Sequence, residues 1–141
     1  MPFADSITLA GGAFAVRDGL LQWATGSACF APDTPANGMR HTVAVSAGST
    51  ITALSVRARN SSIYEQNFNV TLWAQRPGTT GGVQVHSAPF TVAAGQELFE
   101  SRVELPTPEL ADPGEALYLS FSPATGSTWL CAAEIEFHRP G

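Results

Sequence analysis

The sequence contains no lysine, and its charge is sparse: seven arginines face twelve acidic residues among 141, for a formal charge of −5. Nucleic-acid binding needs a basic footprint that neutralises phosphates, and these arginines are scattered along the chain. We therefore expect no nucleic-acid partner. The absence of lysine also excludes Schiff-base chemistry and a phosphate-binding loop built around a lysine.

Long hydrophobic runs are missing as well. Gly, Ser, Thr and Asn interrupt every uncharged stretch, so no segment offers the roughly 20 apolar residues of a membrane-spanning helix. The first residues lack the positive and apolar regions of a secretory signal. The expected location is the cytoplasm or a virion, unless the sequence is a fragment of an exported protein.

Cysteine is scarce too, with only Cys29 and Cys131. Two cysteines cannot form a zinc site by themselves, and there is no Cys-x-x-Cys motif. We favour two unpaired thiols packed as small apolar residues. The alternative is a bridge across about a hundred residues, which would stabilise the fold by about 4.7 kcal/mol and would need an oxidising compartment.

What the sequence does contain is alternation of apolar and polar residues with period two. Strict alternation places one set of side chains on the core and the other toward water, as in half-buried antiparallel strands. The sets predicted to face the core are Thr52, Leu54, Val56 and Ala58; Phe68, Val70, Leu72 and Ala74; Phe99, Ser101, Val103 and Leu105; Leu117, Leu119 and Phe121; and Trp129, Cys131, Ala133, Ile135 and Phe137.

Turn-forming clusters such as Asp112-Pro113-Gly114 separate these runs, as in a sandwich or barrel. The first thirty residues are less regular, with short strands expected at 6–9, 20–24 and 28–31. The sequence predicts an all-β fold, an antiparallel, jelly-roll-like β-sandwich of about eight to ten strands. It forms a single domain over 1–141, in which 1–30 is an N-terminal arm or supplies edge strands.

The segment from His41 to His138 resembles known β-sandwich modules. A turn at 47–50 leads into Ile51–Arg59, and Gly114-Glu115-Ala116-Leu117-Tyr118-Leu119-Ser120-Phe121 precedes a final strand over 129–138. This layout is similar to modules of bacterial surface proteins and phage structural proteins, and to jelly-roll carbohydrate-binding modules. The resemblance covers about two thirds of the chain and implies the fold, without assigning any site residue.

The sequence contains few residues or motifs typical of catalysis. There are three histidines and no Gly-x-Ser-x-Gly elbow, so no catalytic residue is assigned. Glu134, Glu136 and His138 project from one face of the last strand and are weak candidates for a metal site. Neighbours at that spacing lie about 6.5–7 Å apart, so a cross-strand residue would have to complete it. We favour a solvated charged face, with Arg57, Arg59 or Arg102 pairing across the sheet.

A sugar-binding platform needs an aromatic face with amides nearby. Trp73 falls on the outer side of its strand beside Asn67, Asn69 and Gln75, and Tyr118 falls outward on another strand. These five are the candidate ligand-binding residues, although a loop or a second subunit could cover Trp73 instead. We place Trp129 on the core side.

The outward faces are rich in Ser, Thr, Asn and Ala, which lose water more readily than Lys or Glu. Strand edges also lack the lysines that usually guard them. Our leading hypothesis is a non-catalytic structural or adhesive module that self-associates or binds a surface partner, as a virion accessory or cell-surface component. The alternatives are a carbohydrate-binding module and a small β-barrel enzyme with a dispersed site. No cofactor is expected.

Overall fold

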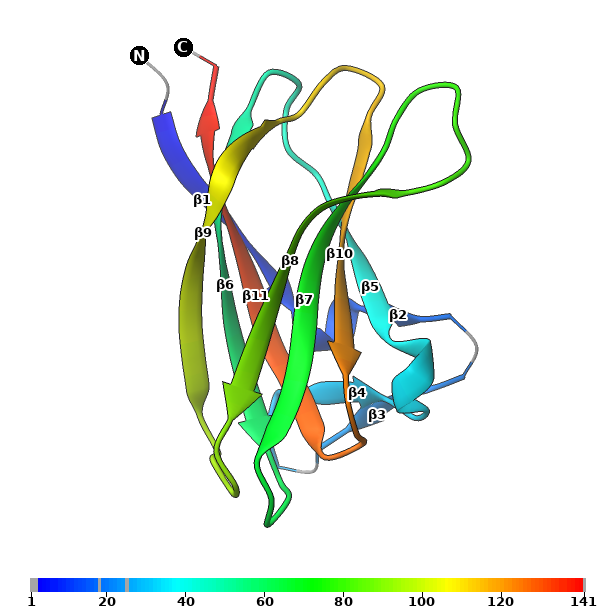
Figure 1. Ribbon diagram of the computed structural model, residues 1–141, viewed down its shortest axis with the longest axis vertical. Coiled ribbons are helices and arrows are strands. Elements are labelled where there is room, and N and C mark those ends of the chain that lie inside the picture. The colour runs from blue at the N-terminus through cyan, green and yellow to red at the C-terminus, as the bar shows by residue number, and fades with distance from the viewer. Residues whose placement is uncertain (1–2, 18, 25, 141) are drawn as a thin grey trace.

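A computed structural model describes residues 3–17, 19–24 and 26–140. Two antiparallel sheets face each other as a β-sandwich of the jelly-roll type (Figure 1). The structure therefore confirms the predicted fold class. The described residues form eleven strands, and the shortest ones lie in the irregular N-terminal part.

The first sheet runs in the order β3-β4-β11-β6-β9, and β1 also pairs with β11. β4 pairs with β11 at Leu130, and β1 pairs along residues 132–139. Residues 3–10 therefore lie in the chain's own sheet. The strand bounds are β1 Phe3–Ala10, β3 Leu21–Trp23, β4 Phe30–Pro32, β6 Thr50–Asn60, β9 Phe99–Leu110 and β11 Thr128–Arg139.

The second sheet runs in the order β2-β5-β10-β7-β8. Two short 3-10 helices, η1 (Gly11–Ala13) and η2 (Pro35–Asn37), connect strands near its β2 and β5 edge. The bounds are β2 Ala15–Val16, β5 Met39–Val43, β7 Gln66–Gln75, β8 Val83–Val92 and β10 Ala116–Pro123.

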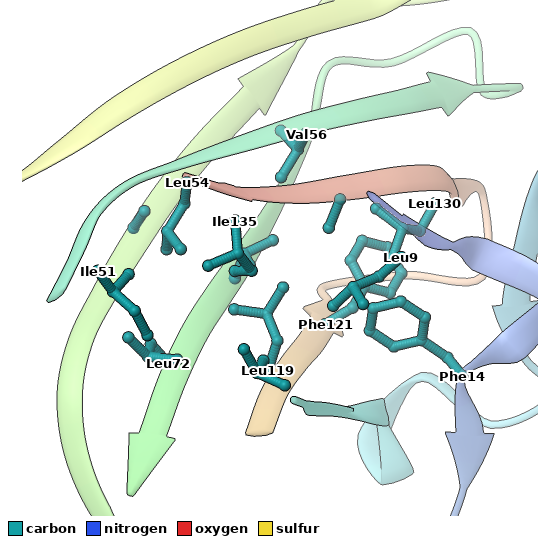
Figure 2. Packing of buried hydrophobic residues seen from close by; sticks show 14 of the residues in the cluster. Leu9, Phe14, Ile51, Leu54, Val56, Leu72, Leu119, Phe121, Leu130 and Ile135 are labelled. Atoms are coloured by element: carbon teal, nitrogen blue, oxygen red, sulfur yellow. The ribbon is translucent and has the colours of Figure 1, made fainter. Parts of the chain in front are cut away.

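The core fills the space between the sheets, as Figure 2 shows for Leu54, Leu72 and Ile135. The predicted alternation describes β7 and β10 well, because Phe68, Val70, Leu72 and Ala74 are buried, as are Leu117, Leu119 and Phe121. On β9 the charged residues Glu100, Arg102 and Glu104 are exposed, as the pattern predicts.

Two bulges shift the alternation on β6 and β11. The β6–β9 register is irregular between Ile51 and Ala53, so both of these residues are buried while Thr52 is only half-buried. An extra residue in β11, Cys131, separates Leu130 from Ala132 in the register with β6. A bulge moves the side chains before it to the opposite face, which period-two counting cannot foresee.

Trp129 was predicted to face the core, and this prediction is wrong because of the β11 bulge. Leu130 is buried in its place, while Trp129 is half-buried and its indole N–H donates to the Ser61 hydroxyl at 3.0 Å. Cys131, also assigned to the core set, is likewise half-buried.

The cysteines form a disulfide, which corrects the expectation of two free thiols. Cys29 precedes β4 and bonds to Cys131 in the bulge of β11, 102 residues later. Pairing of β3 with β4 and of β4 with β11 brings the two cysteines together. This placement depends on strand order, which the sequence did not reveal.

None of the helices in the described residues is long and apolar enough to cross a membrane.

Candidate functional site

The outer face of the second sheet carries an aromatic pair. Trp73 on β7 lies directly opposite Tyr118 on β10, and the two rings are parallel to within 9° with centroids 6.1 Å apart. The Trp73 indole N–H donates to the Ser120 hydroxyl at 2.9 Å. Both rings are half-buried, so the pair is held in place while part of each ring stays accessible.

The β7–β8 loop passes close to this aromatic pair at Gly82. A side chain at Gly82 would collide with the Tyr118 hydroxyl and would come within 3.5 Å of the Trp73 ring. Glycine therefore lets the loop pass close to both rings. Trp73 is therefore partly covered by a loop of its own chain, which is one of the arrangements that the sequence left open.

Beside the aromatic pair the surface is hollowed by about 210 Å³. Four strands and η2 contribute to this depression, which we call the aromatic hollow. It is lined by Ala15, Arg17, Asn37, Gly38, Met39, Arg40, Trp73, Tyr118, Ser120 and Ser122.

The turn after η2 brings the N-terminal part of the chain to the hollow. Pro35 begins η2 with a backbone angle suited to a helix start, and Gly38 follows with a φ of +59°. A Cβ at Gly38 would lie 3.0 Å from the Phe121 carbonyl oxygen, so a side chain would strain this turn. The chain then enters β5 with Arg40 opposite Ser120 on one side and Ala15 on the other.

The five predicted ligand-binding residues are only partly brought together. Trp73 and Tyr118 line the aromatic hollow, whereas Asn67, Asn69 and Gln75 do not. The Asn67 side-chain oxygen accepts a hydrogen bond from the Thr91 hydroxyl at 2.8 Å, and Gln75 donates to the Thr79 carbonyl at 3.1 Å. Asn69 is exposed, in register with Ser122.

Sequence reasoning missed the contribution of Arg17, Asn37 and Arg40. Arg40 does lie in an alternating segment, because Met39 and Val43 are buried while Arg40 is exposed. Five residues are too few for a convincing period-two pattern. Asn37 belongs to a short 3-10 helix, and Arg17 directly follows the two-residue strand β2. Elements this short give the sequence no periodic signal.

A second hollow of about 400 Å³ lies on the outer face of the opposite sheet. Its lining includes the short side chains of Ser55 and Ala132 next to longer, charged ones. We call it the charged hollow; its lining side chains include Arg57, Arg102, Glu100 and Glu134.

The proposed metal candidates Glu134, Glu136 and His138 do not converge. Glu136 is engaged by Arg102 through hydrogen bonds of 2.6 and 3.2 Å, and Arg102 also reaches Glu104 at 3.0 Å. These hydrogen bonds, to Glu136 first and then to Glu104, raise the pKa of Arg102 above its ordinary value. Within the described part of the chain, no three His, Cys, Asp or Glu residues are grouped to hold a metal ion.

The Arg102–Glu136 pair confirms the expected cross-strand ion pairing on this face. Both partners are substantially exposed, so the pair contributes little to stability. Arg102, Glu104 and Glu136 accordingly form an ion-pair network on the solvated outer face of β9 and β11.

The chain was compared with known proteins by sequence and by fold. No known family profile matches the chain, and no curated protein matches it in sequence. Among solved structures, a Podospora anserina β-(1,4)-mannanase with GH26 and CBM35 parts aligns over 96% of this chain at 16% identity with a TM-score of 0.56. A Clostridium thermocellum xylanase, described as CBM22-1–GH10 modules complexed with xylohexaose, aligns over 97% at 15% identity with a TM-score of 0.56.

A third solved structure, the carbohydrate-binding module CBM36 in complex with calcium and xylotriose, aligns over 94% of this chain and 98% of its own length. Its identity is 13% and its TM-score 0.55. This chain spans only 28% and 25% of the lengths of the mannanase and xylanase structures. The protein therefore has the β-sandwich fold of carbohydrate-binding modules, and no single family is assigned.

Proposed function

We propose that the protein is a carbohydrate-binding module whose ligand lies in the aromatic hollow. The observation that carries the proposal is the fixed Trp73–Tyr118 pair beside a depression lined by hydroxyl, amide and guanidinium groups. Small-ligand sites typically combine apolar or aromatic walls with a few well-placed polar groups. The similarity of the fold to carbohydrate-binding modules supports the same choice.

The chemistry of the hollow suits a sugar. The C–H face of a pyranose ring packs on aromatic rings, and its hydroxyls exchange hydrogen bonds with donors and acceptors at the rim. Ser120 already accepts from Trp73, so its own hydroxyl hydrogen remains available to a ligand. The hydrogen bond to Ser120 also fixes the indole before binding, which lowers the entropic cost of ordering it.

The structural or adhesive hypothesis has less support, because the solved structures with the same fold include carbohydrate-binding modules. A surface-adhesive role is compatible with glycan binding, since a glycan is itself a surface partner. Self-association remains a separate prediction, which is addressed in the Discussion.

The test is titration of the protein with soluble β-glycans and pectic glycans by calorimetry or affinity electrophoresis. Trp73→Ala is expected to weaken binding about ten-fold or more, as loss of a central aromatic contact does at other interfaces. Trp23→Ala is the matched control, because Trp23 is 56% exposed and lies on the opposite sheet. Equal loss in both variants, or no glycan bound by the wild type, would contradict the proposal.

A further inference from the structure

The aromatic hollow is lined by basic side chains on a protein whose net charge is negative. Two of the seven arginines, Arg17 and Arg40, line it, and no acidic residue is among its described lining residues. The whole chain carries twelve acids and a charge of −5. The described lining of the hollow therefore includes basic side chains and no acidic ones, although the molecule as a whole is acidic.

Arg40 is positioned at the hollow next to the Tyr118 ring. Its guanidinium carbon lies 5.5 Å from the centroid of the Tyr118 ring, a cation–π distance. The side chain is exposed, and the ion pairs found among the described residues do not include it. Arg102 differs, because Glu104 and Glu136 both satisfy its charge.

A guanidinium held over an aromatic ring can still donate hydrogen bonds in its own plane. Its planar fork matches two oxygens of a carboxylate or sulfate, and a charge-assisted pair of this kind is stronger than a bond to a neutral hydroxyl. The hydroxyls of a neutral sugar can accept from this guanidinium, but they offer no charge-assisted pair of oxygens to the fork. The arrangement around Arg40 thus favours a ligand that carries an anionic group next to a sugar ring.

Building on the proposed glycan-binding function, we infer that the ligand is an anionic glycan. A sugar ring packs against Trp73 and Tyr118, and its carboxylate or sulfate is received by Arg40, with Arg17 at the same hollow. The two sources of the anion, a uronic acid and a sulfate ester, share this chemistry and are separated by the experiment.

The charged hollow on the other sheet differs from the aromatic hollow in its lining residues. It is the larger of the two at about 400 Å³, but it has no aromatic lining residue, and Glu100 and Glu134 stand beside its arginines. These carboxylates would repel an anionic ligand. Arg57 in that hollow is exposed like Arg40, so Arg57→Gln removes the same charge from the protein as Arg40→Gln without touching the aromatic hollow.

The experiment compares an oligogalacturonide with its methyl ester of equal length, together with a sulfated galactan oligosaccharide. Wild type, Arg40→Gln, Arg40→Lys and Arg57→Gln are titrated calorimetrically at low and high salt. We expect the wild type to bind one of the two anionic probes about ten-fold more tightly than the neutral ester. The preference should shrink at high salt, because the partly exposed charges are screened.

Arg40→Gln should abolish the preference for the anionic probe over the neutral ester, and Arg40→Lys should retain only part of this preference because the planar fork is lost. Arg57→Gln should behave as the wild type. Preference for the galacturonide identifies a carboxylate, and preference for the sulfated probe identifies a sulfate. Unaltered thermal unfolding confirms that each variant is folded.

The experiment distinguishes failure of the anionic-ligand inference from failure of the proposed glycan binding. Equal affinity for the anionic and neutral probes, or an anion preference that survives in Arg40→Gln, would overturn the anionic ligand and leave glycan binding intact. Absence of binding to every neutral and anionic probe would overturn the proposed function itself.

Discussion

Glu109 on β9 is a carboxyl group in an unfavourable position. Burial raises its pKa above the ordinary value, and the negative charges of Glu115 and Asp112 add to this effect while Arg76 opposes it. The side chain of Glu115 is buried, and one of its oxygens lies 3.3 Å from the Arg76 guanidinium. The Arg76 guanidinium is also 3.8 Å from a carboxylate oxygen of Glu109, so one exposed arginine forms ion pairs with two carboxylates.

This pKa shift predicts how stability depends on pH. Because the folded protein holds the Glu109 proton more tightly than the unfolded chain, stability falls as pH rises from about 4.3 through the raised folded pKa. Glu109→Gln removes this loss, since its amide never ionises. We expect Glu109→Gln to become more stable relative to the wild type as pH rises through that window, measured by urea unfolding at pH 4 and pH 7.

The control for this experiment is Glu97→Gln, because Glu97 is exposed and outside the Glu109–Glu115 group. Its difference from the wild type should not change across the same pH range. If the Glu109→Gln difference is also constant, the carboxyl is not destabilised in the folded state.

At the scale of elements, β11 ties the molecule together. It pairs with β1, β4 and β6, and Cys131 in its bulge bonds to Cys29 just before β4. The two-stranded β3–β4 segment has only a single register pair with β11, and the disulfide adds a covalent cross-link between this segment and the sheet. We propose that the protein folds in an oxidising compartment, where a link of this kind forms and persists.

The disulfide predicts a large effect of reduction. A bridge that closes about a hundred residues restricts the unfolded chain, and its removal typically costs about 2–5 kcal/mol. We expect the Cys29→Ser/Cys131→Ser variant to unfold at lower urea concentration than the wild type by this amount. Reductant should bring the wild type to the same midpoint and leave the variant unchanged. Two titratable thiols in the folded, non-reduced wild type would contradict the bond.

At the scale of the whole molecule, the sheet edges are guarded without lysine. The edge strand β8 contains Pro89, and the edge strand β9 contains Pro106 and Pro108 together with exposed charges. Proline has no N–H to donate, so another strand pairs poorly along these stretches. The missing lysines therefore do not imply that neighbouring subunits cover these edges.

A surface suited to self-association lies at the lower end of the sandwich in Figure 1, where the β6–β7 and β8–β9 loops meet. Ile63, Tyr64 and Leu98 are 81%, 69% and 59% exposed. The buried Asn60 amide donates to the Tyr64 carbonyl at 2.8 Å and the Ala93 carbonyl at 3.1 Å, which fixes both loops. Exposed apolar residues on a rigid base are typical of interfaces.

The self-association hypothesis predicts a solution mass at a multiple of 14.8 kDa, measured by light scattering on a sizing column. Ile63→Ser/Leu98→Ser should lower the mass toward the monomer by removing the exposed apolar surface. Leu20→Ser is the control, because Leu20 is 75% exposed just before β3. A wild-type mass of 14.8 kDa at every concentration tested would exclude self-association.

The sequence by itself determined the sandwich and much of its core. Period-two alternation is a local property of extended chain, so Phe68–Ala74 and Leu117–Phe121 could be assigned to the core without knowing their partners. The same counting placed Trp73 and Tyr118 on the outer face. It failed at Trp129, where a bulge reversed the alternation.

Only the tertiary structure decided which residues lie next to the Trp73 and Tyr118 rings. Arg40 reaches Tyr118 because β5 pairs with β10, and Cys29 reaches Cys131 because β4 pairs with β11. Neither pairing leaves a periodic mark in the sequence, since strand order depends on how two sheets exclude water together rather than on any one segment. The aromatic half of the candidate site was therefore visible in the sequence, and its charged half emerged only from the fold.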